Sequence, residues 1–159
     1  MSDIITGMTP SAARRVFGTG VLLCLGGLLL YLSAAQPPAE LHYLALLLVV
    51  AAAILGTGYK MWISTAHRIE LTETELRLSD GTIICRIEDI KNVDRGFFAF
   101  KPSNGFLLTL NKSYPRSWAP GLWWRVGRRV GVGGITPGAQ GKIMADSLAA
   151  MVAQRDGEF

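Results

Sequence analysis

Val16–Ala35 reads VFGTGVLLCLGGLLLYLSAA, a run of about 20 residues without a charged side chain. At a rise of about 1.5 Å per residue, an α-helix of this length crosses the hydrocarbon core of a bilayer. A second run, LHYLALLLVVAAAILGTGYKMWI at Leu41–Ile63, is uncharged as far as Tyr59. A helix that is apolar all the way round is unusual in a small soluble domain. The sequence therefore predicts two transmembrane helices.

The link between the two runs is Gln36–Glu40, QPPAE. Proline lacks a backbone N–H and restricts the residue before it, so Pro37 and Pro38 end the first helix. A link this short predicts an antiparallel helical hairpin over residues 16–63, with helices at 16–35 and 41–63.

Positive charge flanks the predicted hairpin on both sides. Arg14 and Arg15 precede it and Lys60 and Arg68 lie at or after its end, whereas the link has no Lys or Arg. The positive-inside rule then places both termini in the cytoplasm. We expect a multi-pass membrane protein in which residues 1–15 form a cytoplasmic N-terminal segment.

A cleaved signal peptide is the alternative interpretation of the first run. Arg14–Phe17 (RRVF) is similar to a twin-arginine motif, and Ser33–Ala35 (SAA) has the small residues of a cleavage site. The run is long for a signal peptide, however, and a second apolar run follows at once. We therefore favour the hairpin.

Small residues occur in both predicted helices. Gly18, Gly20, Gly26 and Gly27 lie in the first, and Ala52 and Gly56 in the second. Ala52 and Gly56 are four residues apart, a spacing that lets two helices approach closely. We expect these residues to pack within the hairpin; the alternative is a contact with another membrane subunit.

From His67 onward the hydrophobic period changes to two, which is typical of strands. Strands are expected at residues 68–71, 75–78, 82–87, 106–110, 122–126 and 128–133. Residues 87–93 are expected to connect into a further strand that continues over 96–100. Asp80-Gly81 and Pro102–Gly105 predict turns. Pro115 and Pro120 predict a loop over Ser113–Gly121.

The last predicted element is a helix. Thr136 has the side chain of an N-cap residue and Pro137 suits the first turn. An amphipathic stripe follows at Ile143, Met144, Ser147, Leu148, Met151 and Val152. Residues 156–159 are expected to form a frayed tail.

Three segments share their order with a known kind of domain: HRIELTETELRLSDG (67–81), IEDIKNV (87–93) and TPGAQGKIMADSLAAMV (136–152). This order of about seven strands and a closing helix resembles pleckstrin-homology-like domains, in particular bacterial ones that follow a pair of transmembrane helices. The resemblance covers residues 64–155. It implies an α+β membrane protein of the bacterial inner membrane, with a helical hairpin followed by a bent β-sandwich whose C-terminal helix plugs one end.

The sequence suggests neither an active site nor a metal site. His42 and His67 are the only histidines, and on a continuous helix they would lie roughly 37 Å apart, too far to share a metal. Strand alternation should expose Glu70, Glu73 and Glu75, with no nucleophile beside them. Gly127–Gly134 (GRRVGVGG) lacks the G-K-[ST] ending of a phosphate loop, so glycines in a bent strand are the simpler interpretation. We expect no cofactor, no metal and no enzyme activity.

Charge and aromatic residues suggest a binding surface instead. No Asp or Glu occurs from Arg95 to Ala145, and the chain carries a formal net charge of +4. Arginine together with tryptophan is typical of membrane interfaces and of protein hot spots. Trp123 and Trp124 are adjacent, so on a strand one should face inward and the other outward. The candidate binding residues are Arg116, Trp118, Trp123, Trp124, Arg125, Arg128 and Arg129.

The prediction is a non-catalytic, membrane-anchored binding or assembly factor that holds a protein partner or anionic lipid headgroups. The alternatives are an accessory subunit bound through its transmembrane helices and, more remotely, an enzyme. A basic stretch that is only solvated is the simplest explanation of the charge. No nucleic-acid-binding motif is present, so nucleic acid is not an expected partner.

Overall fold

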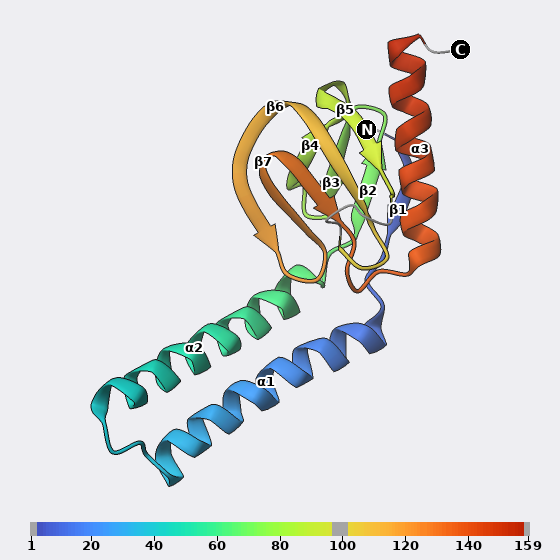
Figure 1. Cartoon of the computed structure of the whole chain (residues 1–159). Helices are drawn as coiled ribbons and strands as arrows, with labels where there is room; N and C mark the ends of the chain where they lie inside the picture. The colour runs from blue at the N-terminus through green and yellow to red at the C-terminus, as the bar shows by residue number, and fades with distance from the viewer. Residues whose placement is uncertain (1–2, 97–101, 158–159) are drawn as a thin grey trace. The chain divides into compact units, whose positions relative to one another are not determined.

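The computed structural model describes residues 3–96 and 102–157. The chain forms two compact units, a helical hairpin of residues 12–63 and a sheet domain made of the residues before and after it (Figure 1). The predicted strand segment 96–100 lies outside the described residues except for Gly96.

The hairpin consists of α1 (Ala12–Ala35) and α2 (Leu41–Ser64). Both helices are long and apolar enough to cross a membrane, with a mean hydropathy of 2.0 each. The helices approach closely at Gly26, where an added Cβ would lie 2.5 Å from Cγ of Leu55. At the open end of the hairpin, the Arg15 guanidinium donates a 2.9 Å hydrogen bond to the Trp62 carbonyl and lies 3.9 Å from the indole centroid. The predicted hairpin is confirmed, and α1 begins before the predicted residue 16.

Ala52 and Gly56 were expected to pack within the hairpin, and this expectation is wrong. Both are exposed, and an added Cβ at Gly56 would meet nothing within 4 Å. Ala51 and Gly58 are the buried small residues of α2 instead. Successive residues of an α-helix are rotated by about 100°, so one residue of offset moves a side chain off the packed face.

The first sheet of the domain has the order β1-β2-β3-β4, all antiparallel. Its strands are β1 (Ile4–Met8), β2 (Ile69–Thr72), β3 (Glu75–Leu78) and β4 (Ile83–Arg86). β3 and β4 are joined at the predicted Asp80-Gly81 turn, where Gly81 has a φ of +90°. Strand β1 corrects the expectation that residues 1–15 form a separate cytoplasmic segment. Its partner β2 lies beyond the whole hairpin, so the hairpin interrupts the domain between its first two strands.

The second sheet has the order β5-β6-β7 and follows a 3₁₀ turn, η1 (Ile87–Asp89). Its strands are β5 (Ile90–Asp94), β6 (Phe106–Ala119) and β7 (Trp123–Val132). The predicted loop over 113–121 is wrong, because β6 continues to Ala119. Pro115 is tolerated there since it lies where the register with β7 shifts, between Tyr114 and Ser117.

Strands β6 and β7 form a strongly bent pair (Figure 1), which we call the β6–β7 arch. The two short strands predicted around Gly127 are one strand, and Gly127 has a φ of +59° opposite Tyr114. Glycine adopts this left-handed conformation without strain, so the strand bends here and pairing continues beyond it. The two ends of β7 meet at the base of the arch, where Gly133 N–H donates a 2.7 Å hydrogen bond to the Leu122 carbonyl.

Helix α3 (Gly138–Asp156) packs against β1 and β5. Its N-cap is Pro137, not Thr136, and no side chain caps it. Met144 and Leu148 are fully buried as predicted, whereas Ile143 is 57 % exposed, which corrects its place in the stripe. Helix α3 includes Asp156, the first residue of the predicted tail, and Arg155 before it donates hydrogen bonds to the carbonyls of Ile87 and Glu88. Residues 158–159 of that tail lie outside the described residues.

One hydrophobic core unites the two sheets and α3. Its large members are fully buried, and each contributes about 1.5–3 kcal/mol relative to exposure. They are Met8, Ile69, Leu71, Leu76, Ile84, Ile90, Phe106, Leu108, Leu110, Leu122, Met144 and Leu148. The α+β class, with seven strands in two antiparallel sheets and a C-terminal helix, is confirmed among the described residues.

Candidate binding surface on the β6–β7 arch

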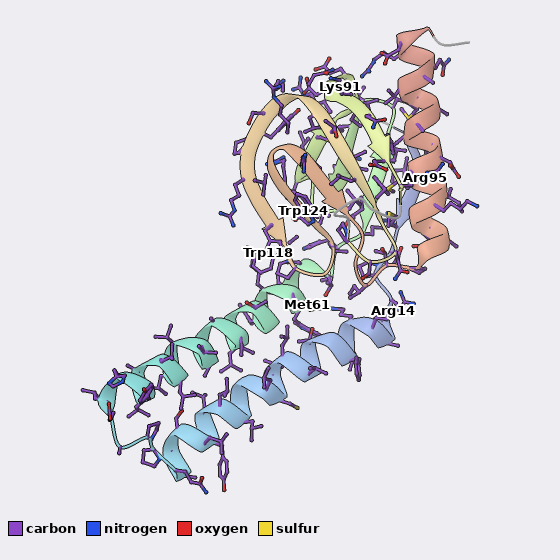
Figure 2. The ribbon with its side chains drawn as sticks, in the orientation of Figure 1. Arg14, Met61, Lys91, Arg95, Trp118 and Trp124 are labelled. Atoms are coloured by element: carbon purple, nitrogen blue, oxygen red, sulfur yellow. The ribbon has the colours of Figure 1, made fainter. Side chains whose placement is uncertain are left out.

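The two outward tryptophans lie near the base of the arch. Trp118 on β6 is paired directly with Trp124 on β7, and Figure 2 shows both side chains on the arch. The Trp124 ring covers Gly131, where an added Cβ would lie 2.3 Å from Nε1. Trp124 is therefore half-buried against its own bent strand, whereas Trp118 is 49 % exposed.

Trp123 belongs to the core and is only 3 % exposed. The prediction that Trp123 and Trp124 face opposite ways is confirmed. A partner cannot reach Trp123 without opening the domain, so its place is in the core rather than in a binding surface.

Arg125 is a structural residue that joins the two sheets. Its guanidinium donates hydrogen bonds of 2.6 Å to the Ile84 carbonyl and 2.9 Å to the Pro115 carbonyl. The same group lies 5.1 Å from the Tyr114 ring centroid and 5.6 Å from that of Trp123. Arg125 thus satisfies carbonyls on β4, an edge strand of the first sheet, and is not available to an external partner.

Three candidate arginines remain exposed around the bend of the arch. Arg128 and Arg129 directly follow Gly127, and Arg116 lies two residues beyond Tyr114, the partner of Gly127. Within residues 3–96 and 102–157, no hydrogen bond or ion pair holds any of these three arginines. Val126 lies beside them and is 53 % exposed. The sequence predicts a strand at this position, and the exposure of Val126 depends on the bend of that strand. We call Arg116, Val126, Arg128 and Arg129 the basic apex.

Lys112, in contrast, is held by a carboxylate. Asp89 Oδ2 accepts hydrogen bonds from Tyr114 Oη at 2.5 Å and from Lys112 Nζ at 3.1 Å. The Tyr114 hydroxyl, and then Lys112, lower the pKa of Asp89 below its usual value. Burial and the bond to Asp89 raise the pKa of Tyr114. This cluster joins β6 at Tyr114 to η1, and the Asp89 carboxylate is used by these two contacts.

The base of the arch lies at the end of the domain from which the chain enters α1. Ile135 N–H donates a 3.0 Å hydrogen bond to the Gly121 carbonyl in the β6–β7 turn, and the Ile135 carbonyl accepts a 3.1 Å hydrogen bond from Ser11 N–H. Ser11 directly precedes α1. We call this the tethered end of the domain. Trp118 lies near it, and the basic apex lies at the opposite end of the arch.

The predicted set of seven residues is therefore divided by the fold. Trp118 and Trp124 lie near the tethered end. Trp123 belongs to the core, and Arg125 joins the two sheets. Of the seven candidates, the basic apex contains Arg116, Arg128 and Arg129. The sequence carried no signal for this division, since it depends on where β6 and β7 bend.

The acidic residues of the first sheet are structural. Glu70 was expected to be exposed, and this is wrong: it is 5 % exposed, with Arg68 Nε at 2.7 Å and Arg77 Nε at 3.6 Å. A buried carboxylate needs such partners to offset its lost hydration. Among the described residues, no group of three or more His, Cys, Asp or Glu side chains could hold a metal ion.

An open hollow of about 830 Å³ lies between α3 and the ends of β3 and β4. Its walls carry charges of both signs, Glu73, Glu75, Arg86, Glu88 and Arg155. Arg86 pairs with Glu88 at 3.4 Å, and Arg155 is occupied by backbone carbonyls. The hollow therefore has no charge preference of the kind seen at the basic apex. No protein-family model, curated protein or solved structure matches this chain.

Proposed function

We propose that this chain is a non-catalytic, membrane-anchored binding protein that uses the basic apex to hold an anionic partner at the cytoplasmic face of the membrane. The observation that carries the proposal is the cluster of exposed arginines Arg116, Arg128 and Arg129, for which the described part of the chain provides no hydrogen-bond or ion-pair partner. The partner class is a protein or anionic lipid headgroups.

The two helices support membrane anchoring. Each has a mean hydropathy of 2.0 and exposes large apolar side chains such as Phe17, 74 % exposed, and Leu41, 79 % exposed. Leaving such a surface in water costs about 25 cal/mol for each Å². Arg14, Arg15 and Lys60 at the ends of the helices favour a topology with both termini in the cytoplasm.

The strand order supports a pleckstrin-homology-like domain. Four consecutive strands form one antiparallel sheet, three form the other, and a single helix follows. The hairpin would then be an insertion between the first two strands of that fold, so that both of its ends are tied to the domain.

The contacts of the polar side chains favour a binding function over a catalytic one. Asp89, Glu70 and Arg125 each satisfy a structural contact. The arginines of the basic apex are different, because exposed cations without partners cost nothing in water and strengthen association with an anion.

Two measurements test this proposal. The intact chain should stay in the membrane pellet after alkaline carbonate extraction. When purified from membranes in mild detergent, the wild-type protein should retain a bound protein or anionic lipid, and Arg128→Glu/Arg129→Glu should lose it.

Lys142→Glu is the control variant, because Lys142 is an exposed cation on α3 that lies beside Gly105, at the base of the arch and not at the basic apex. It should retain the bound partner. Recovery of the chain in the aqueous fraction would rule out membrane anchoring. Equal retention by wild type and the double arginine variant would rule out the basic apex as the binding site.

A second candidate function is an accessory subunit held through its helices. Ala52 and Gly56 of α2 are exposed rather than packed within the hairpin, and that face is open to another helix. In this case Gly56→Leu should abolish co-purification of a membrane partner, and Arg128→Glu/Arg129→Glu should leave it intact.

A further inference from the structure

We infer that the basic apex binds a second copy of this chain, through a surface of the sheet domain that carries the opposite charge. The inference rests on the proposed function, because it takes the basic apex as the binding surface, and it names the protein partner. Its basis is that the described part of the sheet domain carries exposed, unpaired charges of both signs, gathered at two separate places.

The second of these places is the start of β1. Asp3 precedes the first residue of β1, and Glu73 follows Thr72, the β2 residue with which that first residue pairs. In an antiparallel pair these two positions are neighbours, so both carboxylates lie at the same end of the strand pair. Both are exposed, and the described part of the chain provides neither with a hydrogen-bond or ion-pair partner. We call Asp3, Ile5 and Glu73 the acidic edge.

The charges around the acidic edge are otherwise balanced. Four of the five charged residues that line the hollow beside α3 have a partner of opposite sign, in the pairs Glu75–Arg77, Arg86–Glu88 and Arg155–Asp156. Glu73 is the fifth. Ile5, which is 48 % exposed, and Met151 line the same hollow and offer it an apolar wall. The acidic edge therefore suits a cationic side chain that has an apolar neighbour.

The basic apex has that composition. Its three arginines are exposed, and Val126 beside them is 53 % exposed. Contact between the apex of one copy and the acidic edge of another would bring guanidinium groups to carboxylates and would remove Val126 and Ile5 from water. Single exposed ion pairs are weak, but two chains anchored in one bilayer have a raised effective concentration, so several such pairs can act together.

Within one copy, the two surfaces do not neutralise each other. The Tyr114 hydroxyl donates a 2.5 Å hydrogen bond to Asp89 and accepts one of 3.4 Å from the Arg86 N–H. Tyr114 pairs with Gly127 at the bend of the arch, and Arg86 lines the hollow. This junction holds the bend and the hollow in fixed positions in which no apex arginine pairs with the acidic edge, as far as the structure describes the chain. Both surfaces are therefore open to another molecule.

The experiment uses two full-length chains that carry different C-terminal affinity tags and are co-expressed. Capture of one tag in mild detergent measures how much of the other copy is retained, and wild type should retain it. The apex variant, Arg128→Glu/Arg129→Glu in both copies, should reduce retention by about tenfold or more, since attraction becomes repulsion at two positions. The edge variant, Asp3→Arg/Glu73→Arg in both copies, should do the same. The control Lys142→Glu should behave like wild type.

Exchange of charge between the two copies is the sharpest comparison. When one copy is the apex variant and the other is the edge variant, each contact between them again joins opposite charges, so retention should recover. This holds whether two copies close into a dimer or further copies add to the assembly. An unfolded variant could not recover binding in this way, so recovery also shows that both sheet domains are intact.

The outcomes separate this inference from the proposed function. The inference is wrong if wild type retains no second copy, if either charge variant retains it like wild type, or if the mixed pair does not recover. It is also wrong if Gly56→Leu abolishes retention and the charge variants do not, since the helices then make the contact. If the apex variant instead loses a different protein or anionic lipid that wild type retains, the proposed function stands alone. If the apex variant loses no bound molecule, both fail.

Discussion

The guanidinium of Arg125 on β7 donates a 2.6 Å hydrogen bond to the carbonyl oxygen of Ile84 on β4, and so joins the edge strands of the two sheets. A neighbouring carbonyl, that of Ile83, lies 3.3 Å from the same nitrogen. This junction explains why an arginine in the middle of a basic stretch serves the fold and not a partner.

Arg125→Ala should therefore destabilise the sheet domain. The loss of charged hydrogen bonds to backbone carbonyls is expected to lower the free energy of unfolding by about 2–3 kcal/mol. Arg116→Ala, at an exposed site on the same arch, should change it by less than about 0.5 kcal/mol. Urea unfolding followed by tryptophan fluorescence measures both values, and equal stabilities would show that the junction contributes nothing.

Gly26 and Gly27 are neighbours in α1 with opposite surroundings. A Cβ at Gly26 would lie 2.5 Å from Leu55 Cγ, whereas one at Gly27 would meet nothing within 4 Å. Gly26→Leu should force the helices apart at a cost of about 1–3 kcal/mol, and Gly27→Leu should be tolerated. Cysteine cross-linking between α1 and α2 in membranes reports the separation. A hairpin that cross-links equally in both variants would contradict this packing.

Stability should depend on pH through Asp89. The folded-state pKa of Asp89 is lowered, chiefly by the Tyr114 hydroxyl, so its contribution is present above the unfolded-state pKa of about 3.9 and is lost as pH falls through the folded-state value. Asp89→Asn should thus be less stable than wild type near neutral pH, and the difference should shrink in acid. Unfolding curves over this pH range test it; a difference that grows in acid would contradict the assigned sign.

The two cysteines report on membrane insertion. Cys85 is buried, and burial raises the pKa of its thiol to about 12, so it should not react with a maleimide in the folded protein. Cys24 is exposed on α1, but a thiol in lipid has no water in which to ionise. An impermeant maleimide should label neither cysteine in native inverted vesicles and both after denaturation in detergent.

Ser113→Cys supplies the control for this labelling, because Ser113 is exposed on β6. It should react in inverted vesicles and not in intact cells if the domain is cytoplasmic. Labelling of Cys24 in native vesicles would show that the hairpin is in contact with water.

The sequence predicted those parts of the fold that depend on residues within a single short segment. The two apolar runs and the prolines between them predicted the hairpin, and Asp80-Gly81 predicted the β3–β4 turn because glycine at φ of +90° suits that turn. The adjacency of Trp123 and Trp124 predicted that one of the two would face inward, and the structure shows that this residue is Trp123. Each of these features depends on residues that are close together in the chain.

The tertiary structure decided everything that depends on distant partners. Ile4–Met8 becomes a strand only because β2, beyond the hairpin, pairs with it, and SYPRSWA continues β6 only because β7 lies beside it. Glu70 is buried because Arg68 and Arg77 reach it. The division of the basic stretch into a junction at Arg125 and an exposed apex at Arg128 follows from the bend at Gly127. Hydrophobic period and turn chemistry act over a few residues, whereas strand pairing and burial of charge depend on which segments meet in space.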